Sequence, residues 1–321
     1  MRIWAVLPIL AVIAATPNSR VEAASTPVAA PSSEAAESVT VTATPLPHRS
    51  AVDEFVYSYP TPVRTTDKIA RWKRGICPVV YGLSPRFADF ITTRMKAIAR
   101  NAGAPVDADP KCRHNIEIVF TTTPQALADD LRKNHWPYLG YFDNFHQADE
   151  LAKVTHDIQA WYLTGTVGYN GFVRVDNPRQ DFLTGMWGSN GVMDGFGGID
   201  GGHVYYAPGA GRFNIGPAST LYNVIITADP RKLGNYEMGS LADYIAMLAL
   251  SQPMSFDACW EVPSITNLLT RDCQPERKTA TLSDNDARFL YGLYKMDTGK
   301  AVQLQRSEIR YFMEHRAADK Q

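Results

Sequence analysis

The sequence predicts an α+β domain with a mixed β-sheet and flanking helices; an α/β arrangement of the same mixed sheet is the alternative. Two observations support this class. From residue 76 onward, short apolar and β-branched segments alternate with segments of helical periodicity. The composition, with 45% hydrophobic and 20% charged residues, is ordinary for a globular protein. We expect one globular domain over residues 51–300 and a C-terminal amphipathic helix or tail over 301–321.

The first expected elements are two strands, each followed by a helix. Residues 76–83 (ICPVVYGL) predict a strand, and Ser84 with Pro85 provides an N-cap and first turn for a helix that Gly103 ends. Residues 115–121 alternate in polarity, which indicates a second strand, and a second helix is expected over 123–131.

A glycine-dense segment separates the next strands. Residues 158–167 and 221–228 are rich in apolar and β-branched residues and predict strands, with a short candidate strand at 204–207. Residues 185–202 contain eight glycines in eighteen positions. Such a segment fits neither a helix nor a central strand, so we expect a loop or insertion there.

Three helices are expected toward the C-terminus. Residues 240–250 are almost continuously apolar, which is typical of a buried helix. Residues 283–296 form a second helix, and residues 303–316 have the pattern of an amphipathic one.

The N-terminal segment has the pattern of a secretory signal peptide. Arg2 precedes thirteen mostly apolar residues at 3–15, and Val21-Glu22-Ala23 fits the small-x-small pattern before a cleavage site, with Ala14 or Ala15 as alternatives. A membrane span needs about 20 apolar residues, so no transmembrane anchor is expected after cleavage. No cysteine follows for a lipid anchor. We therefore expect a periplasmic or secreted protein with a disordered Ala/Pro/Ser linker over 24–50.

Four cysteines remain after signal cleavage, an even number that predicts two disulfides in an exported protein. Proximity along the chain favours Cys77–Cys112 and Cys259–Cys273, although three pairings are formally allowed and free buried thiols are the alternative. No C-x-x-C pair exists, which argues against a zinc ribbon.

Charge excludes one class of partner. The formal net charge is −1, and no block of lysines and arginines is present that would neutralise a run of phosphates. We therefore expect no nucleic-acid partner.

Two short motifs in the last third resemble a known family. The sequence PSITN at 263–267 is similar to the S-I-M-N turn beneath the metal in metzincin zinc peptidases, with Thr266 at the methionine position. Residues 282–294 (LSDNDARFLYGLY) resemble the closing helix of the matrixin-like members, L-S-x-x-D…L-x-x-L-Y. The resemblance implies a zincin-like layout with the glycine-rich segment as an insertion, as in exported bacterial proteins that lack the zinc ligands.

The zinc-binding motif of that family, H-E-x-x-H-x-x-G-x-x-H, is not preserved here. Aligned with it, Glu237 keeps the position of the general base, but the ligand positions hold Tyr236, Ser240 and Ala246. Zinc is possible, but no cofactor is predicted. A local interpretation competes: Ser240 and Asp243 form an S-x-x-D capping box in front of an apolar run, which would place Glu237 outside the helix.

Histidines elsewhere are weak candidates for metal ligands. His135, His146, His156 and His203 lie in expected loops or near strand ends. The first three are separated by eleven and ten residues, which matches no single helical face and no standard metal motif. Of these, His135, His146 and His203 are kept as candidates.

The favoured function is a non-catalytic scaffold that binds a peptide, a protein or an envelope component. The expected site is a groove beside the 240–250 helix, with Ser240, Asp243 and Tyr244 as binding residues, together with the aromatic segment 134–157. The alternative is a divergent metal-dependent hydrolase in which Glu237 or the histidines carry the chemistry. A structural envelope protein without a small ligand is a third reading.

Overall fold

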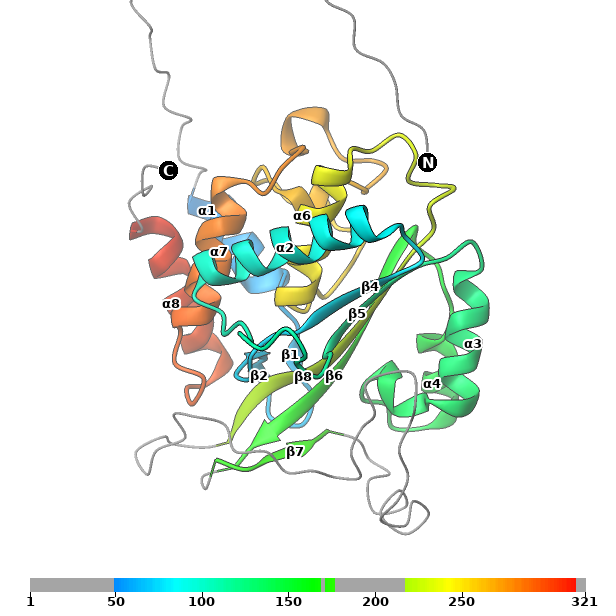
Figure 1. Cartoon of the computed structure of the whole chain (residues 1–321). Coiled ribbons are helices and arrows are strands. Elements are labelled where there is room, and N and C mark those ends of the chain that lie inside the picture. Colours follow the sequence, from blue (N-terminus) through cyan, green and yellow to red (C-terminus); the bar gives the residue numbers. More distant parts are fainter. Residues whose placement is uncertain (1–48, 169–170, 177–216, 316–321) are drawn as a thin grey trace, which may run out of the picture. The chain divides into compact units, whose positions relative to one another are not determined.

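The structure is a computed structural model that describes residues 49–168, 171–176 and 217–315 (Figure 1). These residues belong to one compact unit. The predicted signal peptide, nearly all of the predicted linker, the glycine-rich segment 185–202, the candidate strand 204–207 and His203 lie outside the described residues.

A six-stranded mixed sheet forms the centre of the domain, in the order β4-β5-β8-β6-β7, with β3 also paired to β8. The strands β3, β4, β5 and β8 run parallel, whereas β6 is antiparallel to both β8 and β7. This confirms the predicted α+β class with a mixed sheet. The strands are β3 (Arg71–Trp72), β4 (Pro78–Tyr81), β5 (Ile116–Phe120), β6 (Ile158–Val167), β7 (Val173–Val175) and β8 (Ala218–Ala228), with a separate antiparallel pair β1 (Pro62–Val63) and β2 (Lys68–Ile69).

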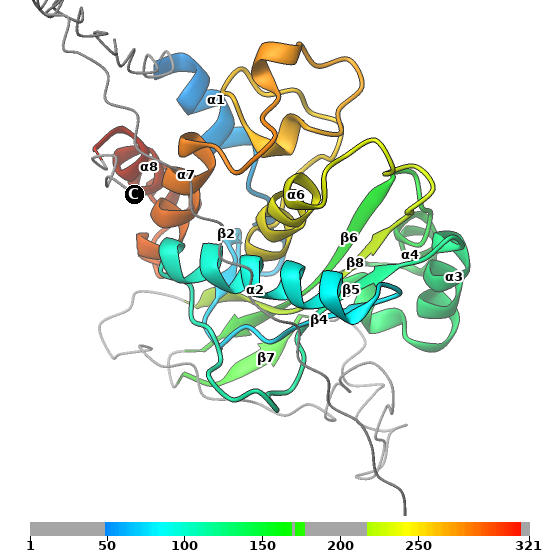
Figure 2. The same ribbon diagram turned by 45° about the horizontal axis from the view of Figure 1, so that its top comes forward.

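Helices cover the two faces of the sheet unequally (Figures 1 and 2). On one face α1, α2, α6, α7 and α8 share a large core with β4, β5 and β8, and on the other α3, η1 and α4 pack against β6 and β8 in a smaller core. The helices are α1 (Arg49–Ser58), α2 (Pro85–Ala102), α3 (Pro124–Asn134), α4 (Phe145–Leu151), α6 (Met238–Leu250), α7 (Asp284–Lys295) and α8 (Val302–His315), with 3-10 turns η1 (Trp136–Leu139), η2 (Ile265–Asn267) and η3 (Pro275–Arg277).

Most predicted elements are confirmed. Pro85 stands in the first turn of α2, and Gly103 ends that helix with a φ of 82°, a conformation that glycine adopts without steric cost. At α7 Ser283 and Asp286 form a complete capping box. Both predicted disulfides, Cys77–Cys112 and Cys259–Cys273, are present, and no free cysteine remains.

Several boundaries differ from the predictions, and two of these differences concern the helices of the larger core. The linker was expected to continue to residue 50, but α1 begins at Arg49 and buries Phe55 and Val56 in the larger core. Helix α6 was expected to begin at Ser240, but it begins at Met238 with Glu237 as its N-cap. The first helical hydrogen bond runs from Leu241 N to Glu237 O at 3.1 Å, so it lies before Ser240, the N-cap that the capping pattern predicts.

The buried C-terminus of α6 is closed by side chains from four places in the chain. The carbonyls of the last turn of a helix lack most of their intrahelical donors. Here Met247 O accepts from Ser251 N at 3.2 Å, and the residues from Met247 to Leu250 are all buried. The hydroxyl of Ser251 donates to Met247 O, that of Tyr162 to Leu248 O, the indole of Trp72 to Ala249 O, and the hydroxyl of Tyr294 to Leu250 O, at distances of 2.6–3.0 Å. These bonds fix α6 relative to β3, β6 and α7, and so fix the helix beside which the candidate site lies.

Candidate functional site

A cavity of about 610 Å³ lies between α6, the start of β6 and the segment that follows α6. Its volume is within the range of about 300–1,000 Å³ that is usual for ligand sites. The floor is apolar and the rim is polar. The lining residues are Thr155, His156, Asp157, Ile158, Tyr244, Phe256, Asp257, Cys259, Leu269, Thr270, Arg271 and Asp272.

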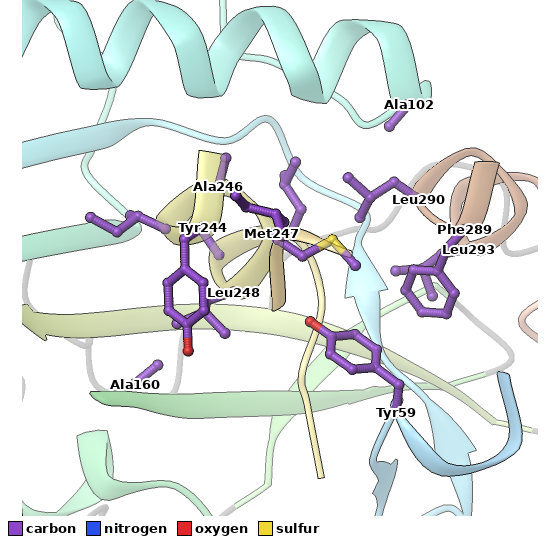
Figure 3. Close-up of a cluster of buried hydrophobic side chains, with 14 of the residues drawn as sticks. Tyr59, Ala102, Ala160, Tyr244, Ala246, Met247, Leu248, Phe289, Leu290 and Leu293 are labelled. Atoms are coloured by element: carbon purple, nitrogen blue, oxygen red, sulfur yellow. The ribbon is translucent and has the colours of Figure 1, made fainter. Parts of the chain in front are cut away.

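Tyr244 is a buried polar residue that lines this cavity. It lies on α6, is only 2% exposed, and its ring points toward the strand that carries Ala160 (Figure 3). Its hydroxyl has no hydrogen-bond partner among the residues that the structure describes. Three other buried tyrosines, Tyr59, Tyr162 and Tyr294, all place their hydroxyls against Ser251 or backbone carbonyls.

The difference matters because a hydroxyl that lines a cavity without a described protein partner is available to a ligand. Burial raises the pKa of Tyr244, with a contribution from the nearby charge of Asp257, so the hydroxyl stays protonated. A protonated phenol can both donate and accept a hydrogen bond. Tyr244 therefore offers a ligand one polar contact at the floor of the cavity.

The rim carries charges of both signs. Asp157 pairs with Lys232 at 3.0 Å. Arg271 and Asp272 also line the rim, and within the described residues neither forms an ion pair. These two side chains are exposed and free to meet a charged ligand.

His156 connects several residues on one side of the rim. The Nδ1 atom of His156 lies 2.8 Å from Thr155 Oγ1, and its Nε2 atom lies 3.0 Å from Asp257 Oδ1. The imidazole ring also packs on Phe256, with ring centroids 5.2 Å apart. These contacts join the start of β6 to the segment after α6 and hold one wall of the cavity.

The opposite wall is the loop closed by the Cys259–Cys273 disulfide. Inside this loop the buried Asn267 side chain accepts from Trp260 N and donates to the carbonyls of Trp260, Val262 and Arg277. The disulfide and this amide constrain the same loop, so the wall is preformed.

The turn that resembles the metzincin turn is held by the capping residue of α7. The carboxylate of Asp286 accepts from Ile265 N at 2.8 Å and from the hydroxyl of Ser264. Burial raises the pKa of Asp286, while these hydrogen bonds lower it. Thr266, at the methionine position, is buried, and η2 packs against α6.

The capping role predicted for Asp243 is wrong. Asp243 is fully buried in the middle of α6, where its carboxylate receives a bidentate contact from Arg94 of α2 and accepts from Leu282 N at 2.8 Å. It joins α2, α6 and the segment before α7. Ser240 is also buried, does not act as the N-cap, and does not line the cavity.

The other predicted site residues lie apart from the cavity. Glu237 is exposed at the N-cap of α6 and makes no capping side-chain bond. His135 ends α3 beside Asp130 at 3.7 Å, and His146 is exposed on α4. In the described part of the chain, no three His, Cys, Asp or Glu side chains are grouped so that they could hold a metal ion.

Of the predicted binding residues, only Tyr244 reaches the cavity. Sequence reasoning missed Arg271, Asp272 and Asp257, because charged residues in a loop are usually solvated and carry no periodic signal. In the sequence these residues lie within two positions of Cys259 or Cys273, and this position beside a predicted disulfide indicates an ordered loop.

No helix among the described residues is long and apolar enough to cross a membrane. Comparison of the chain with protein-family models, with curated proteins and with solved structures finds no match in any of the three.

Proposed function

We propose that this is an exported, non-catalytic binding protein that takes a short peptide, free or as part of an envelope component, into the cavity beside α6. The observation that carries the proposal is the Tyr244 hydroxyl, buried at the cavity floor and left without a partner among the described residues. Because this hydroxyl lines the cavity, it can form a hydrogen bond with a ligand without giving up a bond to a described residue of the protein.

Two features support the cellular setting and the scaffold in this proposal. Two disulfides favour an oxidising compartment, in agreement with the signal-like N-terminal sequence. The zincin-like relationship is supported by the 264–267 turn, which is held by Asp286 and packs beside α6. The loss of histidines at 236, 240 and 246 is the reason to expect binding without zinc-dependent catalysis.

Calorimetric titration with a panel of N-acetylated, amidated dipeptides tests the proposal. We expect apolar members such as N-acetyl-leucyl-leucinamide to bind, and Tyr244→Phe to weaken their binding about fivefold, the value of one neutral hydrogen bond. Tyr81→Phe, at an exposed tyrosine of β4, is the matched control and should change nothing. Equal affinities for the wild type and Tyr244→Phe would exclude the cavity as the site.

A second candidate function is ester or amide hydrolysis, which the Thr155–His156–Asp257 contacts favour. They combine the residue types of a nucleophile, a base and an orienting acid. The Asp257 side chain is 82% exposed, however, so water competes for the contact that would orient the imidazole. If the wild-type protein hydrolyses p-nitrophenyl acetate and His156→Ala does not, the hydrolase function is supported and the non-catalytic proposal is wrong.

A further inference from the structure

We propose that the cavity selects ligands that carry a free ammonium group and a free carboxylate together with an apolar side chain, as an unblocked dipeptide does. This inference rests on the proposed function and names the class of ligand for the same site. It follows from three properties of the lining: unpaired charges of both signs, an excess of acid on the rim, and an apolar floor.

The unpaired charges are the first step. Arg271 and Asp272 are consecutive exposed residues on the rim, and neither forms an ion pair within residues 49–168, 171–176 and 217–315. The guanidinium group of Arg271 offers a planar fork that matches a carboxylate. The carboxylate of Asp272 can accept from an ammonium group. A ligand with one charge would leave the second of these groups without a partner.

The acidic excess gives the ammonium group a second contact. Asp257 lies on the rim, close enough to Tyr244 for its charge to influence the phenol. Its Oδ1 atom contacts His156, but the side chain is mostly exposed and a carboxylate has about four acceptor positions. Asp257 and Asp272 therefore both offer acceptor positions to an ammonium group in the cavity, and the Tyr244 hydroxyl offers a further polar contact.

The floor requires an apolar part in the ligand. Ile158 and Tyr244 are buried at the base of the cavity, and Phe256 and Leu269 are half-buried in its walls. Transfer of apolar ligand surface from water to such a floor is favourable, so an apolar side chain increases the affinity of the ligand. A dipeptide with leucine side chains combines this surface with both terminal charges.

The ligand test compares leucyl-leucine with its blocked forms by calorimetric titration of the full-length mature protein. We expect leucyl-leucine to bind about tenfold more tightly than N-acetyl-leucyl-leucinamide, with the two singly blocked forms between them. Each exposed charge contact is then worth about threefold, the usual size at a screened surface. The preference should decrease at 0.5 M NaCl, because salt screens exposed charges.

The variant test assigns each terminus to its partner. Arg271→Gln should weaken leucyl-leucine about threefold and leave leucyl-leucinamide unchanged, because the amide lacks the carboxylate that Arg271 would bind. Asp272→Asn should weaken leucyl-leucinamide but leave N-acetyl-leucyl-leucine unchanged. Arg86→Gln and Asp89→Asn, exposed on α2 away from the cavity, are the matched controls.

The outcomes separate this inference from the function on which it rests. If the blocked dipeptide binds as tightly as leucyl-leucine and Tyr244→Phe weakens both, the cavity binds peptides but the zwitterion inference is wrong. If none of the four forms binds, both the inference and the proposed function are wrong. Equal losses for charged and blocked ligands in Arg271→Gln would also overturn the inference, because they indicate a change in the loop.

Discussion

Replacement of Tyr294 by phenylalanine removes a single hydroxyl from the buried end of α6. That hydroxyl donates to Leu250 O at 2.8 Å, and Tyr294 lies within the larger core. The phenylalanine ring occupies the same space, so no cavity forms. The Leu250 carbonyl then loses its donor at the end of the helix, where the chain offers no intrahelical replacement. We expect a loss of about 1–3 kcal/mol in the free energy of unfolding.

The matched comparison is Tyr244→Phe, which removes a hydroxyl from a tyrosine of α6 itself, whereas Tyr294 lies on α7 and reaches the end of α6. The hydroxyl of Tyr244 has no partner among the described residues, so its removal leaves no protein group unsatisfied. We expect the free energy of unfolding to change by no more than about 0.5 kcal/mol. Tyr162→Phe, which removes the donor to Leu248 O at 3.0 Å, should behave like Tyr294→Phe.

Urea unfolding without a reducing agent keeps both disulfides intact and measures the free energy of unfolding of all three variants. With a slope of about 2–3 kcal/mol/M, a loss of 2 kcal/mol lowers the midpoint by roughly 0.7–1 M. If Tyr244→Phe destabilises the protein as much as Tyr294→Phe, the distinction between a capping hydroxyl and a cavity hydroxyl is wrong.

Two further predictions concern buried charges. Burial raises the pKa of Glu117 from 4.5 to about 7, so the folded state binds this proton more tightly than the unfolded state. Stability should therefore fall as the pH rises from about 4.5 to about 7, by up to about 3 kcal/mol, and urea titrations should show a smaller fall in Glu117→Gln. Arg94→Ala leaves the fully buried Asp243 carboxylate without its ion-pair partner and should cost about 3 kcal/mol at pH 7. A cost below about 0.5 kcal/mol, measured by urea unfolding, would show that Leu282 N alone is enough for that carboxylate.

Local signals predicted the elements whose ends depend on neighbouring residues. The start of α7 follows from the spacing of Ser283 and Asp286, and the end of α2 follows from Gly103. The Cys259–Cys273 pairing follows from the short separation of these two cysteines along the chain, 14 positions. In each case the interacting residues are close together in the sequence, so a short sequence pattern is enough to predict the interaction.

Asp243 shows where local reasoning fails. The S-x-x-D spacing fits a capping box, but the partner of Asp243 is Arg94, which lies 149 positions earlier in the chain. A capping box and a buried ion pair use the same carboxylate, and the spacing alone does not distinguish them. The helix α1 was missed for a related reason, because its stabilisation comes from the burial of Phe55 and Val56 against distant helices.

The sequence by itself predicted the fold class, most of the helices and strands and, as the favoured pairing, both disulfides. Only the tertiary structure decided where the candidate site lies. Its residues come from the start of β6, from α6 and from the Cys259–Cys273 loop, up to 117 positions apart between Thr155 and Asp272. That the Tyr244 hydroxyl has no partner among the described residues follows only from the folded arrangement, because hydrogen bonding depends on distance in space and not on position in the chain.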